Sequence, residues 1–173
     1  IHALHFHHGL QAEAGDWQSH CKQFCEQRGI PFHSEQLNVS GGNGDSLEQA
    51  ARNARYRAVA RIIGPDELYL TAHHAEDQAE TLFLNLMRGS GIEGLAGIPE
   101  IRNLEPGWVA RPLLDIRRNE LVAFLEERKI GWLEDPSNQD KRFDRNYLRL
   151  ELFPLLERRW PGISQRLERT ARN

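Results

Sequence analysis

The sequence contains few cysteines and no long hydrophobic run, and each of these absences excludes a class of protein. No apolar stretch approaches the roughly 20 residues that a membrane-spanning helix requires, and no signal peptide is recognisable. The two cysteines, Cys21 and Cys25, stand four residues apart on a predicted helix, where side chains are poorly placed for a disulfide. A second cysteine pair for a zinc site is lacking. We therefore expect a cytoplasmic protein with free thiols.

The composition is that of an ordinary globular chain, but the charge is unevenly distributed. With 39% hydrophobic and 27% charged residues in a length of 173, one domain with a small appendage is expected. The formal net charge is −3, yet residues 141–173 hold nine basic side chains against four acidic ones. This basic end predicts either a contact with phosphate groups or a solvated helix face, and charge alone does not decide. We accordingly divide the chain into an α/β domain, residues 1–140, and a basic helical extension, residues 141–173.

Short apolar runs alternate with amphipathic stretches along the chain, which predicts a parallel sheet with helices on both faces. Because the chain begins at Ile1, directly in a strand-like run, we expect the first element of this fold to be missing. The predicted strands are residues 1–8, 32–39, 68–72 and 108–114, and the predicted helices are residues 12–28, 47–63, 73–87 and 116–129, with a final helical stretch to residue 172.

A cluster of titratable side chains opens the helix that follows the third predicted strand. The residues are His73, His74, Asp77 and Glu80, and the spacing of positions 73, 77 and 80 places them on one helical face. Acids in a first helical turn also occur for dipole reasons alone, but this alternative does not explain the histidine pair. The cluster therefore predicts a ligand site at the carboxyl end of a parallel strand.

Further candidate ligands lie elsewhere in the chain. His7 and His8 end the first predicted strand, where they can line a ligand cleft, whereas zinc ligation is not favoured because no matching ligand spacing occurs. Arg52 and Arg55 are one helical turn apart and can point together at a phosphate, or they are solvated surface arginines. Arg111 lies on the last predicted strand.

The glycine-rich run S-G-G-N-G-D-S at residues 40–46 has two interpretations. A glycine-rich turn between a strand and a helix N-terminus is a plausible phosphate cradle. Alternatively, it is a connection followed by a capping box, with Ser46 as the N-cap and Gln49 three residues later.

Seven motifs occurring in a fixed order identify a family resemblance. The chain resembles the catalytic domain of the bacterial tRNA(Ile)-lysidine synthetases, within the PP-loop ATP pyrophosphatase superfamily and its adenine nucleotide alpha hydrolase-like fold. The motifs that carry it are H-H-G-L (7–10), A-R-N-A-R-Y (51–56), A-H-H-A-E-D-Q-A-E-T (72–81), R-G-S-G (88–91), R-P-L-L (111–114), E-D-P-S-N (134–138) and R-N-Y-L-R (145–149).

The resemblance implies a two-step ligase reaction. ATP adenylates carbon 2 of the wobble cytidine of tRNA(Ile), and free lysine then displaces AMP to give lysidine. In this scheme His73, His74, Asp77 and Glu80 form the catalytic cluster, and the two acids meet either the lysine ammonium group or Mg²⁺. The implied substrate- or phosphate-binding residues are Arg52, Arg55, Arg111, His7 and His8, and the implied tRNA-binding residues are Arg145, Arg149, Arg158 and Arg159. A homodimer is left open.

One departure from the family pattern limits this interpretation. The family's nucleotide loop, S-G-G-x-D-S, precedes H-H-G-L, whereas the run at residues 40–46 follows it and has one residue too many. We interpret that run as a chance similarity, assign no phosphate role to Asp45 or Ser46, and expect a fragment that lacks its ATP loop and its C-terminal domains and is inactive alone. The alternatives are a tRNA thiolase, which tends to carry a C-x-x-C arrangement unlike Cys21 and Cys25, a metal-dependent hydrolase and a noncatalytic tRNA-binding module.

Overall fold

A computed structural model describes residues 1–7, 14–38 and 47–172, so His8 and the glycine-rich run at 40–46 lie outside the described residues. The chain forms two compact units: Ile1–Glu67 with Leu104–Gly107, and Leu68–Asn103 with Trp108–Asn173. This division does not coincide with the predicted boundary at residue 140. The physical reason is that the C-terminal helices pack against the helix that carries the acidic cluster, within the same unit.

The first unit is built on a parallel strand pair. Strand β1 (Ala3–His7) pairs in parallel with β2 (Phe32–Gln36), and His7 lies opposite Gln36. Helix α1 (Ala14–Glu26) lies between the two strands in the sequence. Helix α2 (Leu47–Ala60) follows, and the small side chains Ala54 and Ala58 let it pack closely on Leu37 and Phe6. Both cysteines are free thiols, as predicted, and Cys25 is buried.

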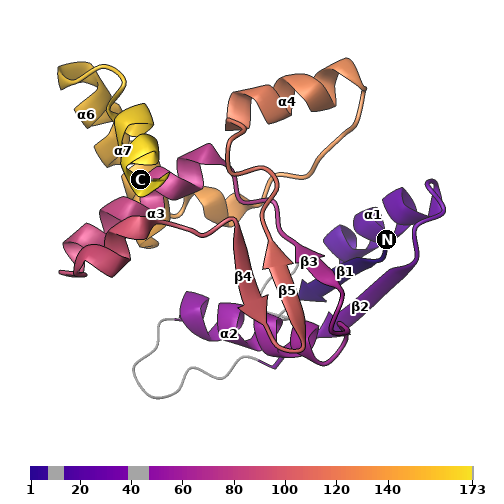
Figure 1. Ribbon diagram of the computed structural model, residues 1–173. Helices are drawn as coiled ribbons and strands as arrows, with labels where there is room; N and C mark the ends of the chain where they lie inside the picture. Colours follow the sequence, from indigo (N-terminus) through magenta and orange to yellow (C-terminus); the bar gives the residue numbers. More distant parts are fainter. Residues whose placement is uncertain (8–13, 39–46, 173) are drawn as a thin grey trace. The chain divides into compact units, whose positions relative to one another are not determined.

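The second unit contains a three-stranded sheet in the order β3-β5-β4. Strand β3 (Leu68–Leu70) is parallel to β5 (Gly107–Ala110), and β4 (Ile101–Leu104) runs beside β5 at the edge (Figure 1). Strand β5 ends four residues earlier than predicted, because the chain turns at Arg111–Leu114 and Pro112 has no backbone N–H to continue a ladder. Strand β4 was not predicted from the sequence.

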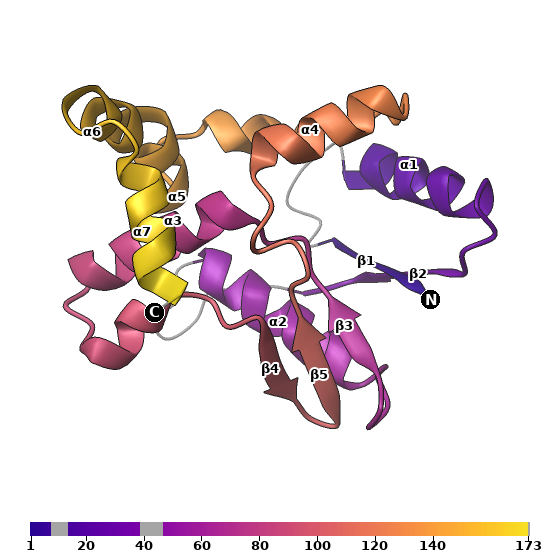
Figure 2. The ribbon, with the colours of Figure 1, turned by 45° about the horizontal axis from the view of Figure 1, so that its top comes forward.

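Helix packing in the second unit centres on α3 (Ala75–Met87), and α7 (Ile163–Arg172) crosses beside it (Figures 1 and 2). Their core joins Ala79 and Leu84 of α3 to Leu148 and Phe153, and the rings of Phe83 and Phe153 meet edge to face with centroids 5.9 Å apart. The remaining elements are the 3-10 helix Ile92–Ala96, α4 (Arg118–Glu127), the 3-10 helix Pro136–Gln139, α5 (Asp144–Tyr147), a π-helical turn at Leu148–Leu152 and α6 (Phe153–Arg159).

The predicted α/β class is therefore confirmed, with parallel strands that alternate with helices. One local prediction is wrong. Helix α3 begins at Ala75 with His74 as its N-cap, so His73 precedes the helix and does not share a helical face with Asp77 and Glu80. Among the described residues, no helix is both long enough and apolar enough to cross a membrane.

Candidate functional site

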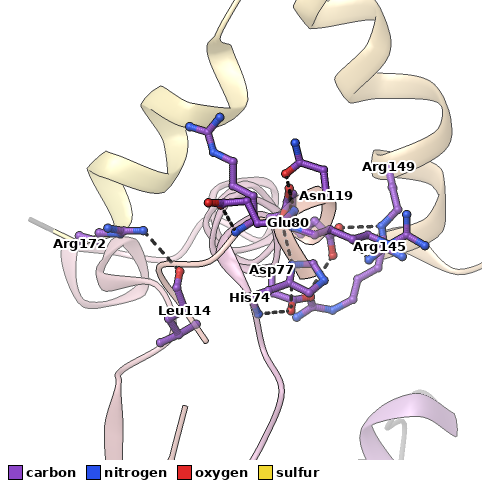
Figure 3. A network of polar contacts seen from close by, with 12 residues as sticks. His74, Asp77, Glu80, Leu114, Asn119, Arg145, Arg149 and Arg172 are labelled. Carbon is purple, nitrogen blue, oxygen red and sulfur yellow. Dashed lines mark hydrogen bonds and ion pairs between the residues drawn. The ribbon is translucent and has the colours of Figure 1, made fainter. Parts of the chain in front are cut away.

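The site is built around the first turn of α3. The backbone of His74 is extended, and its N–H donates to Oδ2 of Asp77 at 2.8 Å, which satisfies one of the unpaired donors of the helix terminus (Figure 3). The negative charge of Asp77 is also favourable at the positive end of the helix dipole. Asp77 therefore has a structural function in addition to any chemical one, and the side chain is only 17% exposed.

The His74 ring lies between two carboxylates. Its Nδ1 atom is 2.9 Å from Oε2 of Glu76 and 3.7 Å from Oδ2 of Asp77, which are ion-pair distances rather than well-aligned hydrogen bonds. Glu76, the nearer carboxylate, does most to raise the pKa of His74, against the opposing effect of burial. Glu76 also accepts from the backbone N–H of Arg118 at the start of α4, at 3.0 and 3.2 Å.

Glu76 was not assigned a role from the sequence. Burial acts to raise the pKa of its carboxyl, but His74 and the backbone N–H groups outweigh burial and hold the pKa below its ordinary value. Glu76 directly precedes Asp77 in the first turn of α3. The sequence indicated a role for Glu76 only through the acidic composition of that turn.

Glu80 is the most enclosed acid of the site, with a side chain only 1% exposed. Arg149 donates from Nε to Oε1 at 2.9 Å, Arg145 donates from Nη1 to Oε2 at 3.2 Å, and Arg145 also donates to Oγ1 of Thr81 (Figure 3). Burial raises the pKa of Glu80, and the two guanidinium groups oppose this shift. These contacts join α3 to α5 and to the π-helical turn that follows it.

The pairing with Glu80 changes the interpretation of Arg145 and Arg149. They were predicted to hold tRNA backbone, which stays a prediction, and their side chains, 24% and 37% exposed, are paired with Glu80. The result is a cluster of both signs, with acids from α3 facing basic groups from the C-terminal segment. Such a cluster is complementary to a zwitterionic ligand.

The site does not fit a magnesium ion held by Asp77 and Glu80. Both oxygens of Glu80 accept from guanidinium groups, which would repel a dication, and Mg²⁺ prefers carboxylate and water oxygens in open octahedral geometry. Among the described residues, no group of three His, Cys, Asp or Glu side chains is placed to hold a metal.

Two other predicted residues of the second unit, His73 and Arg111, have different contacts. The ring of His73 is hydrogen-bonded through Nδ1 to Oγ1 of Thr71 at 2.8 Å. Arg111 is 2% exposed and donates from Nη1 to the carbonyl of Pro99 at 2.5 Å, so its side chain lies in the interior. Together with Gln78 it lines a cavity of about 350 Å³.

The first unit holds the other predicted phosphate ligands. Arg55 is exposed, and the guanidinium of Arg52 lies 5.6 Å from the ring centroid of Tyr56. His7 ends β1 as predicted, and its ring centroid is 6.2 Å from that of His5. Because these residues and Arg111 belong to different units, their joint action on one phosphate stays a prediction.

Comparison with known proteins agrees with the motifs. Residues 1–156 match the model of the PP-loop domain family. The chain is 48% identical over 171 residues to the tRNA(Ile)-lysidine synthase of Pseudomonas aeruginosa, and 45% identical over 171 residues to that of Coxiella burnetii. In each case 99% of the chain is matched, but this is only 38% of the relative's length.

A solved structure shows the same fold. It is the U34-tRNA thiolase NcsA from Methanococcus maripaludis with its [4Fe-4S] cluster, with a TM-score of 0.72 and 16% sequence identity, covering 96% of this chain and 59% of that one. At this identity the likeness concerns the fold alone. From the family match over most of its length, from the ordered motifs and from the parallel α/β architecture, it follows that the chain belongs to the PP-loop domain family.

Proposed function

We propose that this chain is the catalytic part of a tRNA(Ile)-lysidine synthase. The observation that carries the proposal is 48% identity, over 99% of the chain, to a relative of that name. The PP-loop domain supplies the ATP chemistry. In the first step the oxygen on carbon 2 of the wobble cytidine attacks the α-phosphorus of ATP and pyrophosphate leaves. In the second step the side-chain amine of lysine attacks carbon 2, and AMP leaves with that oxygen.

The mixed-charge cluster on α3 is suited to the lysine substrate. Free lysine brings one carboxylate and two ammonium groups, and the cluster offers both kinds of partner. The guanidinium groups of Arg145 and Arg149 are partly exposed and can hold the lysine carboxylate. Among the described residues Asp77 accepts a hydrogen bond only through Oδ2, which leaves Oδ1 for an ammonium group.

The attacking amine must first lose a proton, and we assign this role to the neutral form of His74. Its ring lies within 4 Å of both Glu76 and Asp77, and the raised pKa allows it to retain a proton taken from the lysine ammonium group. Glu80 has a different task in this scheme, because its oxygens hold Arg145 and Arg149 in place.

The phosphate chemistry is assigned to the remaining arginines. Magnesium enters with ATP as part of the substrate and takes no ligand from Glu80. Arg52 and Arg55 neutralise charge on the phosphates, and His7 lies at the strand end where open α/β sheets bind ligands. A tRNA substrate places the reaction in the cytoplasm.

The test uses a protein of the relatives' full length that carries this chain, with tRNA(Ile), ATP and lysine. Asp77→Asn keeps an oxygen that can cap His74 but removes the charge that holds the ammonium group. We expect lysine-dependent AMP release to fall roughly 100-fold, with a raised KM for lysine. Asp144→Asn, at an exposed position on α5, is the matched control.

The outcomes separate the alternatives. If Asp77→Asn turns over like the unaltered protein, the lysine site is wrongly placed. If sulfur rather than lysine enters the tRNA, the protein is a thiolase, and if activity requires stoichiometric zinc, it is a metal-dependent hydrolase.

A further inference from the structure

The basic residues of the C-terminal segment fall into two sets with different surroundings. Five of the nine form ion pairs, each with a carboxylate of its own unit: Lys141, Arg142, Arg145, Arg149 and Arg172. The other four are exposed and make no ion pair with any carboxylate in the described part of the chain: Arg158, Arg159, Arg166 and Arg169. The unpaired set lies only on α6 and α7.

An exposed tryptophan stands at the junction of these two helices. Trp160 directly follows the last residue of α6 and is 51% exposed, although an indole buries a large apolar area when a partner is available. The guanidinium of Arg159 lies 5.8 Å from its ring centroid, and Arg166 donates from Nη2 to its backbone carbonyl. We call residues 157–166 the α6–α7 corner.

The α6–α7 corner is braced by hydrogen bonds from its backbone to one of its own side chains, Glu157. The carboxylate of Glu157 accepts from the N–H groups of Gly162 and Ser164 at 2.6 and 2.9 Å, which caps the start of α7. These bonds lower the pKa of Glu157, and the bond from Ser164 has the largest effect. The carboxylate charge is thereby engaged with the helix terminus. Gly162 has φ +79°, a conformation that glycine adopts without strain. The indole is therefore displayed by a preformed turn.

We propose that the α6–α7 corner is a docking surface for unpaired nucleotides of RNA. A base stacks on the exposed face of Trp160, and Arg158, Arg159 and Arg166 contact the neighbouring phosphates. Stacking on an aromatic ring, combined with flanking cations, is how proteins bind single-stranded nucleic acid with little sequence preference.

The charges near the α6–α7 corner support RNA as the occupant. Its own acid, Glu157, is already engaged by backbone donors, and the buried Glu168 of α7 faces the interior. The side chains of Arg158, Arg159 and Arg166 thus present an uncompensated positive field around a flat ring, which is complementary to phosphates that alternate with bases. The proposal rests on the proposed function only in that the RNA would be tRNA.

The experiment measures binding of this chain to a fluorescently labelled single-stranded RNA oligonucleotide, without ATP or lysine. Trp160→Ala is expected to weaken binding between roughly 5-fold and 150-fold, the effect of losing one stacked base. Trp160→Phe should retain most of the affinity, because a smaller ring still stacks. The matched control is Trp132→Ala, since Trp132 is 43% exposed but lies outside the α6–α7 corner.

The salt dependence tests the arginines. Replacing Arg158 and Arg159 together by glutamine should reduce the slope of log affinity against log salt by about 1.4, because each lost phosphate contact on single-stranded RNA accounts for about 0.7. Arg142→Gln is the control, since Arg142 is 88% exposed but already paired with Asp140, and the slope should not change.

Two results would overturn the proposal. One is Trp160→Ala binding RNA as tightly as the unaltered chain does. The other concerns vesicles that contain anionic lipid. If replacing Arg158 and Arg159 by glutamine abolishes vesicle binding but leaves RNA binding unaffected, the α6–α7 corner is a membrane contact. These experiments measure binding and not catalysis. A negative result here therefore does not affect the proposed function, which is tested separately by lysine-dependent AMP release.

Discussion

The buried amide of Gln78 offers a sharp test of how the site is held together. Gln78 lies on α3 between Asp77 and Glu80 and is 3% exposed. Its Nε2 donates to the carbonyl of Ile98 at 2.8 Å, and its Oε1 accepts from the N–H of Ile98 at 2.7 Å. One side chain therefore satisfies both backbone groups of a buried residue outside regular structure.

Replacing Gln78 by methionine keeps a similar volume and removes both hydrogen bonds. A buried backbone group left without a partner costs about 1–3 kcal/mol, so two such groups cost roughly 2–6 kcal/mol before relaxation. Because the cavity beside Ile98 can admit water to part of the site, we expect a loss of about 3 kcal/mol in the free energy of unfolding. At about 2–4 °C per kcal/mol, the midpoint of thermal unfolding should fall by roughly 6–12 °C.

Chemical and thermal denaturation followed by circular dichroism measure this loss. Gln78→Glu is a second variant, which can still accept from the Ile98 N–H but cannot donate to the carbonyl when ionised. It should recover stability as the pH is lowered toward the pKa of the new carboxyl. Gln165→Ala, at an exposed position on α7, is the control and should change stability by less than about 0.5 kcal/mol. A loss below about 1 kcal/mol for Gln78→Met would refute the reasoning.

Three further predictions concern neighbouring contacts. The pKa of His74 is raised from 6.5, chiefly by Glu76, so its charged form contributes stability that is fully present below 6.5 and is lost as the pH rises through the folded-state pKa. The free energies of unfolding of the unaltered chain and of His74→Gln are compared by denaturation between about pH 6 and about pH 9. The difference between them should shrink as the pH rises, and a constant difference would contradict this. Gly97→Ala should cost roughly 2–4 kcal/mol in the same assay, because φ is +64° and the new methyl group would collide with Oε1 of Gln78 and lie 2.8 Å from Cβ of Ala171. Gly131→Ala, where a methyl group meets nothing within 4 Å, is its control, and equal losses would remove the explanation. Asp115→Asn breaks a 2.8 Å ion pair with Arg172 whose side chains are 74% and 41% exposed, so thermal unfolding should show a loss below about 0.5 kcal/mol, and more than about 1 kcal/mol would mean that the pair is not solvent-screened.

Local sequence pattern was sufficient for the class of fold and for the position of the acidic cluster. The apolar runs at β1, β2 and β3 and the helical spacing after them predicted a parallel α/β chain, because side-chain periodicity follows backbone geometry directly. The start of α3 was placed two residues too early. Periodicity cannot distinguish His73 from His74 as the residue before the helix, whereas the bond from the His74 N–H to Asp77 does.

The surroundings of the charged residues depended on the tertiary structure. In the sequence, Arg145, Arg149, Arg158 and Arg159 form one basic stretch, and nothing local separates them. Folding brings the first two onto Glu80, which is 65 and 69 positions away along the chain, and leaves the other two exposed beside Trp160. The sequence by itself thus determined which residues carry charge and which segments are helical. Only the tertiary structure decided which of those charges are neutralised, because an ion pair depends on distance in space and not on separation along the chain.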